Sequence, residues 1–103
     1  MDVSDKPWGS FSQSDYTDAQ WEAATVLDHG EGNTAKERYG LPVREPDGTL
    51  NRNGVHAAAG DLVGARGGVK APPAAKKAAA RKLVSLYRQI GDPPPDSLVR
   101  LAG

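Results

Sequence analysis

Cysteine is absent from this chain of 103 residues, and histidine occurs only twice. Without thiols, the chain cannot build a disulfide framework, a thiolate metal site or a cysteine nucleophile. His29 and His56 are not spaced to complete a metal site together. We therefore interpret His29 as a residue at the C-terminal end of a helix, where it interacts with the helix dipole. His56 is expected to be a partly buried residue that forms a hydrogen bond.

Large apolar side chains are also scarce. Leu, Ile, Val and Phe together number 18 residues, whereas alanine alone accounts for 15. Because alanine buries little surface, the sequence predicts a small core that depends on close helix packing or on burial against a partner. No apolar run approaches the length of a membrane-spanning helix, and the first residues lack the features of a signal peptide. We expect a soluble protein without membrane contact.

The sequence shows no recognisable catalytic constellation. No acidic residue pairs with a nucleophile or a second carboxylate at a spacing that a mechanism requires. Three serines, at positions 10, 12 and 14, lie in a polar segment without a nearby base. The glycines of GARGGV lack the preceding strand and the Lys-Ser/Thr pair of a phosphate-binding loop. We therefore predict no enzymatic activity and no cofactor.

Charge is unevenly distributed, although the formal net charge is zero. Residues 1–51 contain 4 basic and 10 acidic residues, whereas residues 52–91 contain 8 basic residues and 1 acidic residue. Such a chain could associate with itself head to tail, or present an acidic surface to one neighbour and a basic surface to another. It could also fold back and neutralise its own charges.

The first predicted helix begins at Thr17. Thr17 and Gln20 have the spacing of a capping box, and Tyr16 and Trp21 have the spacing of a hydrophobic staple. The following residues keep a rough helical period, and Gly30 offers a left-handed stop. We expect this helix to continue almost to Gly30.

A turn is predicted between the first and second helices. The sequence EPDG at 45–48 is typical of a tight turn, and the flanking Leu41, Val43 and Leu50 predict a short, poorly paired hairpin. Pro42 has no amide donor, so any strand at this position should lie at the edge of a sheet.

Two further helices are predicted. Asn51 is a good N-cap, and the apolar residues that follow recur with helical spacing until the glycines within 64–68. The third helix should start at Pro72 and Pro73, because proline is tolerated in a first turn, and should stop at Gly91.

The predicted fold is therefore mainly α. We expect a compact three-helix domain over residues 17–91, with a short hairpin-like turn segment between helices 1 and 2. Residues 1–16 should form an extended aromatic N-terminal arm, and residues 92–103 an extended Pro-rich C-terminal tail. The end of that tail could form one last helical turn, capped by Asp96 or Ser97.

Candidate partner-binding residues fall into two groups. Trp8 and Phe11 lie in the arm, where they either dock as an anchor into a pocket of this domain or of a neighbour, or close over the core of their own domain. The second group is basic and occupies the third helix and the loop before it: Arg66, Lys70, Lys77, Arg81 and Arg88. This basic face is either solvated, in contact with protein, or in contact with nucleic-acid phosphates, in which case affinity should fall steeply with salt.

Several motifs resemble a small domain encoded by tailed bacteriophages and prophages. They comprise Leu41-Pro42, the DG turn, Leu50-Asn51, the sequence VHAA, the GARGGV loop, AARKLVSLY and the closing Pro94-Pro95. The N-terminal KPWGSFSQSDYTDAQW also fits, so the resemblance covers nearly the whole chain. That domain is associated with head morphogenesis and is sometimes fused to the prohead protease or encoded near it. No catalytic residue of the protease carries over.

The resemblance implies a noncatalytic virion or head-assembly protein that binds the capsid lattice, as a decoration, cement or minor capsid protein. Its partners would be the major capsid protein or other phage head proteins. It would be located in the virion, and in the host cytoplasm during assembly. Two alternatives remain: a nucleic-acid-binding module that uses the basic face, and a regulatory or targeting domain for the maturation protease.

Overall fold

Helices predominate in the computed structural model, which describes residues 3–64 and 69–103. Helices, with the short 3-10 helices included, comprise 56% of the described residues, so the mainly α prediction is confirmed. The elements are, in chain order, β1 (Val3–Ser4), η1 (Trp8–Ser10), η2 (Gln13–Asp15), α1 (Asp18–Ala24), β2 (Thr25–Asp28), α2 (Ala35–Arg38), β3 (Tyr39–Pro42), β4 (Leu50–Asn51), α3 (Arg52–Val63), α4 (Pro73–Ile90) and α5 (Asp96–Ala102).

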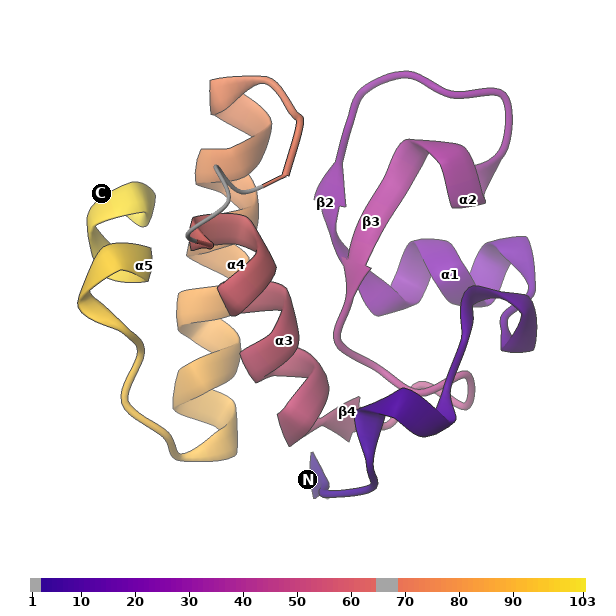
Figure 1. The fold of residues 1–103 in the computed structure, drawn as a ribbon, viewed down its shortest axis with the longest axis horizontal. Coiled ribbons are helices and arrows are strands. Elements are labelled where there is room, and N and C mark those ends of the chain that lie inside the picture. The colour runs from indigo at the N-terminus through magenta and orange to yellow at the C-terminus, as the bar shows by residue number, and fades with distance from the viewer. Residues whose placement is uncertain (1–2, 65–68) are drawn as a thin grey trace.

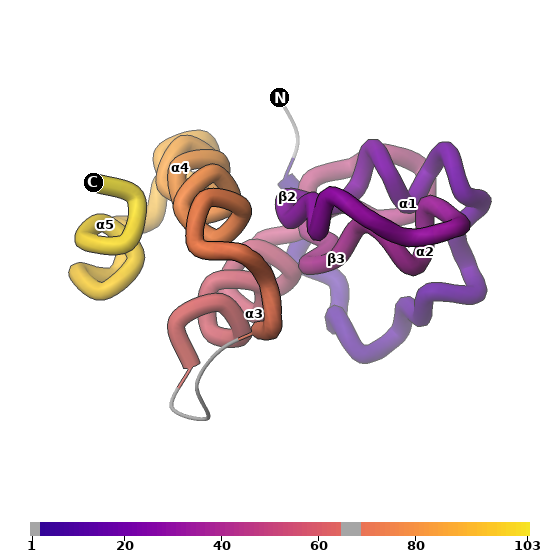
Figure 2. Tube along the Cα trace, turned by 90° about the horizontal axis from the view of Figure 1, so that it is seen from above, coloured from indigo at the N-terminus to yellow at the C-terminus, as the bar shows by residue number. Residues whose placement is uncertain are grey.

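The elements form two groups that share one core. Helices α3, α4 and α5 lie on one side of the molecule, and α1, α2, β2 and β3 lie on the other, as Figure 1 and the view from above in Figure 2 both show. Apolar residues from β2, β3, β4 and the three C-terminal helices form one continuous core cluster. A second, smaller cluster contains Tyr16, Trp21 and Ala24 on the α1 side. Close packing of small side chains replaces the Leu-rich core that this sequence lacks.

The predicted helix starts are confirmed. Thr17 forms the capping box with Gln20 at the start of α1, and the rings of Tyr16 and Trp21 pack edge to face with centroids 5.2 Å apart. The Asn51 side chain accepts a hydrogen bond from the Gly54 amide at the start of α3 (2.9 Å). Helix α4 begins at a proline, whose missing amide donor costs nothing in a first turn.

The predicted helix ends are confirmed for α4 and differ for α3. Gly91 ends α4 with a φ of 79°, a left-handed conformation that glycine adopts without strain. Helix α3 ends at Val63, and Gly64 follows it in an extended conformation. The glycines at 67 and 68, which were also expected to stop this helix, lie outside the described residues.

The first helix is shorter than predicted. It ends at Ala24, and the next four residues form β2, which pairs antiparallel with β3. Two β-branched residues in succession, Thr25 and Val26, favour extended backbone. Val26 and Leu27 are both buried, because one lies against each side of this two-stranded ribbon. The expectation of a helix up to Gly30 was therefore wrong.

The EPDG turn is present, but its flanking strands have other partners. The Gly48 amide donates to the Glu45 carbonyl and the Glu45 amide donates to the Thr49 carbonyl, both at 2.8 Å. A single antiparallel bridge joins Arg44 to Leu50, which agrees with the predicted short, poorly paired hairpin. β3 pairs with β2 instead, and β4 pairs in parallel with β1.

Residues 3–16 and 92–103 are folded, whereas the sequence predicted extended segments; the last helical turn that it allowed in the tail is present as α5. β1 pairs with β4 through Val3 and Leu50. The tail forms α5, which packs against α4 and buries Leu98 completely. Pro95 occupies the N-cap of α5 without a side-chain hydrogen bond, so the expected caps Asp96 and Ser97 are not used. Together, α2 and α5 bring the described α-helices to five, where the sequence predicted three.

Candidate protein-binding surfaces

The aromatic residues of the arm form a pair on the surface of their own domain. Trp8 and Phe11 lie with ring centroids 5.7 Å apart, and both side chains are half-buried. The Trp8 ring covers Gly54 of α3 so closely that a Cβ atom there would come within 3.0 Å of it. The arm therefore packs on its own domain through Trp8, and part of each ring remains accessible.

A buried polar network fixes the backbone of the arm. The Asn51 side-chain amide donates to the Lys6 carbonyl (3.1 Å) and to Glu45 Oε2 (2.9 Å). Asn51 has no exposed surface, and Glu45 is 3% exposed. Lys6 Nζ lies 3.8 Å from Glu45 Oε1, and Asn53 donates to the same Lys6 carbonyl (3.1 Å). Because a buried carboxylate requires such partners, these contacts hold the arm in one position.

This network was not predicted from the sequence. Asn51 was expected only as a helix cap, and Glu45 only as the first residue of a turn. Tyr16, which precedes α1, contacts the same region, because its hydroxyl donates to the Arg44 carbonyl (2.6 Å). Burial raises the pKa of Tyr16, and the nearby Glu45 carboxylate raises it further.

One residue of the basic face predicted on the third helix also forms a hydrogen bond within the fold. Lys77, Arg81 and Arg88 are exposed and lie on one face of α4, and Lys70 is exposed before the helix. Arg81 Nε donates to the Ala102 carbonyl (3.0 Å), so this side chain also fastens the end of α5. The remaining member, Arg66, lies outside the described residues. In Figures 1 and 2, the arm and α4 lie on opposite sides of α3.

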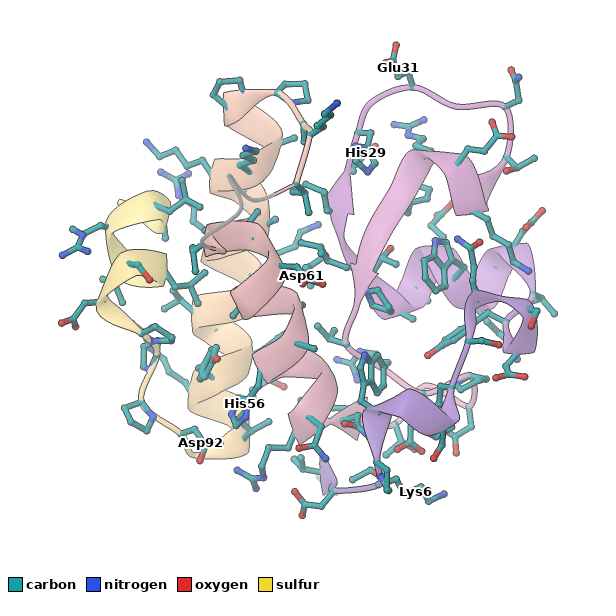
Figure 3. The ribbon with its side chains drawn as sticks, viewed as in Figure 1. Lys6, His29, Glu31, His56, Asp61 and Asp92 are labelled. Carbon is teal, nitrogen blue, oxygen red and sulfur yellow. The ribbon has the colours of Figure 1, made fainter. Side chains whose placement is uncertain are left out.

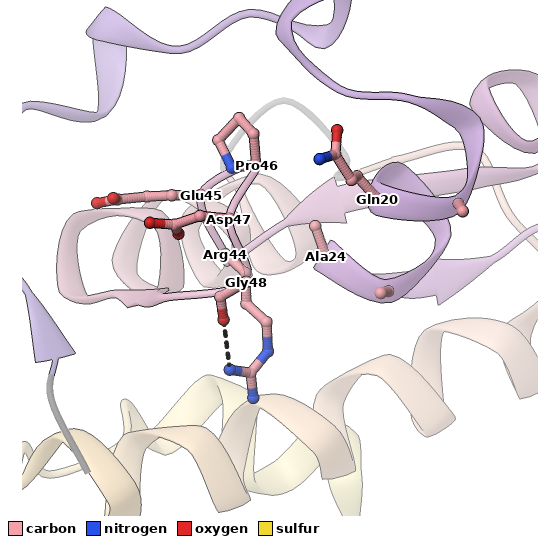
Figure 4. A pocket seen from close by; sticks show the side chains of 9 residues that line it. Gln20, Ala24, Arg44, Glu45, Pro46, Asp47 and Gly48 are labelled. Carbon is pink, nitrogen blue, oxygen red and sulfur yellow. Dashed lines mark hydrogen bonds between the residues drawn. The ribbon is translucent and has the colours of Figure 1, made fainter.

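A first groove lies between α1 and the EPDG turn, with a volume of about 410 Å³ (Figure 4). Three alanines and Gln20 of α1 form one wall, and residues 44–48 form the other. Most polar groups of the turn already have partners: Glu45 binds Asn51, and the Asp47 carboxylate accepts from the Thr49 amide (2.9 Å), which lowers the pKa of Asp47. This groove therefore offers mainly shape and apolar surface.

A second groove lies between β2, the start of the turn and α4, with a volume of about 290 Å³. Its lining combines apolar side chains with two cations, a hydroxyl and an amide: Val26, Val43, Arg44, Lys82, Ser85, Leu86 and Gln89. Arg44 borders both grooves. None of these residues was among the candidate binding residues of the sequence, because Arg44 and α4 are far apart in the chain and only the fold brings them together.

His29 does not lie at a helix end, so its predicted role was wrong. Helix α1 ends at Ala24, and the His29 amide instead donates to the Arg38 carbonyl (2.9 Å), which extends the β2–β3 pairing. His29, Glu31 and Glu37 border a shallow polar hollow at this edge. Within residues 3–64 and 69–103, no group of three or more His, Asp or Glu side chains is arranged to hold a metal ion.

Asp28 and Arg38 form the ion pair that closes the β2–β3 loop. Arg38 donates from Nε and NH2 to the two Asp28 oxygens (2.8 and 3.0 Å), and the Gly30 amide donates to Asp28 Oδ1 (2.8 Å). The guanidinium hydrogen bond, followed by that of the Gly30 amide, holds the pKa of Asp28 at about 2, below its usual value of 3.8. These bonds favour the charged carboxylate.

This depressed pKa predicts a loss of stability in acid. The stabilisation from Asp28 is complete above about pH 4 and disappears as the pH falls through about 2, because protonation removes the acceptor. We expect the free energy of unfolding of Asp28→Asn to fall less than that of the parent between these pH values, as measured by urea denaturation. Asp61→Asn, at an exposed position of α3, should follow the parent. Parallel pH profiles for the parent and Asp28→Asn would contradict this role.

His56 forms the expected hydrogen bond, although it is more exposed than predicted. Its Nε2 lies 3.0 Å from Asp92 Oδ2, its side chain is 45% exposed, and its ring stacks on Tyr87 with centroids 5.5 Å apart. Figure 3 shows His56 and Asp92 beside each other where α3 meets the residues after α4. Arg52 also donates to Asp92 (2.9 Å), and this bond, followed by that of His56, lowers the pKa of Asp92. The cluster joins α3 to the end of α4.

None of the described helices has both the length and the apolar character required to cross a membrane. No protein-family model, curated protein or solved structure matches the chain.

Proposed function

We propose that the chain is a noncatalytic head-assembly or virion protein of a tailed bacteriophage, which binds the capsid lattice as a decoration, cement or minor capsid protein. Support for the biological context comes from the sequence motifs that resemble the head-morphogenesis domain. The partner would be the major capsid protein or another head protein, in the virion and, during assembly, in the host cytoplasm.

The observation that carries the contact part of this proposal is the aromatic pair of the arm. Trp8 and Phe11 are half-buried and in mutual contact, so each retains accessible ring surface. The network of Lys6, Glu45 and Asn51 holds the backbone before them. A large aromatic side chain that is already fixed loses little conformational entropy when it binds, which is typical of residues that dominate an interface.

Co-sedimentation with capsids tests this contact. Phe11→Ala should weaken binding of the purified chain to isolated capsids by about tenfold or more, because truncation of an anchoring aromatic typically costs about 2 kcal/mol. Phe11 is preferred to Trp8 because the Trp8 ring also covers Gly54. The matched control is Val99→Ala, an exposed apolar residue of α5, which should bind like the parent. Equal binding by Phe11→Ala and the parent would remove the arm from the proposal.

Mass spectrometry of purified particles tests the location independently of any variant. Abundant copies in mature virions are expected of a decoration, cement or minor capsid protein. Presence in immature heads and loss from mature ones would instead support the role of a targeting domain for the maturation protease. Absence from both kinds of particle would contradict the proposal.

A further inference from the structure

The groove between β2 and α4 brings together polar groups from two separate parts of the chain. Lys82, Ser85 and Gln89 are exposed and lie three and four residues apart on α4, so they point to the same side of the helix. Arg44 comes from the other half of the molecule, and Figure 4 shows its side chain extending from the EPDG turn toward α4. One guanidinium nitrogen of Arg44 donates to the Gly48 carbonyl (3.1 Å), which restricts its position.

The two cations of this groove have no acidic counterpart among the described residues. Neither Arg44 nor Lys82 forms an ion pair within residues 3–64 and 69–103. Asp28 is close enough for Lys82 to influence its pKa, but both of its oxygens are already bound by Arg38. The groove is therefore positively charged at its rim, although the chain as a whole is neutral.

The floor of the groove is apolar. Val26, Val43 and Leu86 line it and are 6%, 2% and 8% exposed. At about 290 Å³, the groove has room for a side chain and part of the adjoining backbone. A ligand that fits this chemistry has an aliphatic side chain for the floor and carboxylates beside it for Arg44 and Lys82. The hydroxyl of Ser85 and the amide of Gln89 could bind the ligand's backbone.

We propose that this groove binds an acidic segment of a partner protein, in which an aliphatic side chain is flanked by carboxylates. Charge complementarity identifies the occupant, because a cationic rim attracts an acidic segment and the apolar floor selects among acidic segments. A nucleic-acid backbone would use the cations and leave the floor empty. The inference does not depend on a role in phage heads, because it concerns a peptide that can be tested with the isolated chain.

Fluorescence anisotropy with a labelled peptide tests the proposal. The probe has one leucine flanked by two glutamates on each side, and the control probe has glutamines in place of the glutamates. We expect the glutamate probe to bind more tightly, and Lys82→Glu to weaken its binding by about tenfold or more. Lys77→Glu makes the same charge change at another exposed position of α4, turned away from the groove, and should reduce binding only slightly. Both positions are exposed, so circular dichroism should show an unchanged fold.

Four results would overturn the proposal. Equal weakening by Lys82→Glu and Lys77→Glu would indicate general electrostatic attraction, and the absence of binding at low salt would exclude the site. A labelled single-stranded DNA that outcompetes the peptide and loses affinity in Lys82→Glu would identify nucleic acid as the occupant. Concentration-dependent dimers in sedimentation velocity that dissociate in Lys82→Glu would identify a second copy of this chain.

Discussion

Leu98→Ala is expected to lower the free energy of unfolding by about 2–5 kcal/mol, the range for a leucine truncated in a packed core. Leu98 has no exposed surface, because α5 packs against α4 and Leu98 belongs to the main apolar core. The loss combines the transfer free energy of the removed methyl groups with the cost of the cavity that they leave. Since domains of this size are typically stable by about 5–15 kcal/mol, the variant should unfold at much lower urea concentration.

The neighbouring position provides the control. Val99→Ala removes apolar atoms from the same helix, but Val99 is 45% exposed, so its replacement should change stability by about 0.5 kcal/mol or less. Urea denaturation followed by circular dichroism compares the two variants. If both lost the same small amount, the C-terminal segment would be the extended tail that the sequence predicted, and α5 would not belong to the core.

Asn51→Ala is expected to cost about 2–4 kcal/mol, because one side chain has three structural roles. Its carbonyl oxygen caps α3 through the Gly54 amide, and its amide donates to the Lys6 carbonyl and to Glu45 Oε2. Removal of that amide leaves the buried Glu45 carboxylate with Lys6 at 3.8 Å as its remaining ion-pair partner. We therefore also expect faster hydrogen exchange of the amides in residues 3–6, because the arm loses its attachment.

Asn53→Ala separates attachment of the arm from burial of the carboxylate. The Asn53 side chain donates to the carbonyls of Asp5 and Lys6, but it is exposed, and no hydrogen bond joins it to Glu45. Its loss should cost about 1 kcal/mol or less. If Asn51→Ala were no more destabilising than Asn53→Ala, the polar network would have no stabilising role beyond attachment of the arm.

Local sequence signals predicted those features that depend on neighbouring residues. The capping box of Thr17 and Gln20, the cap at Asn51 and the glycine stop at Gly91 are all present, because each rests on backbone groups within one helical turn. The same signals could not locate the end of α1. Residues 25–28 tolerate a helical period, and their extended conformation follows from pairing with β3, which is distant in sequence.

Leu41 has a backbone conformation that depends on the tertiary structure. Leu41 has a φ of 60°, a left-handed conformation that is rare for a branched side chain and that the following proline disfavours further. Nothing in the sequence predicts it. The surrounding structure holds it there, since the side chain is buried in the core and β2 pairs with the strand that contains it.

The sequence by itself determined the mainly α class, most helix starts, the EPDG turn and the individual candidates Trp8, Phe11, Lys77, Arg81 and Arg88. Tertiary structure alone decided which of these residues meet. It placed Trp8 on Gly54, joined Glu45 to Asn51 and Lys6, assigned Arg81 to the end of α5, and brought Arg44 beside Lys82. The physical reason is that caps and turns depend on bonds between close neighbours in the chain. Grooves and buried polar networks instead depend on contacts between distant segments, which form only when the core assembles.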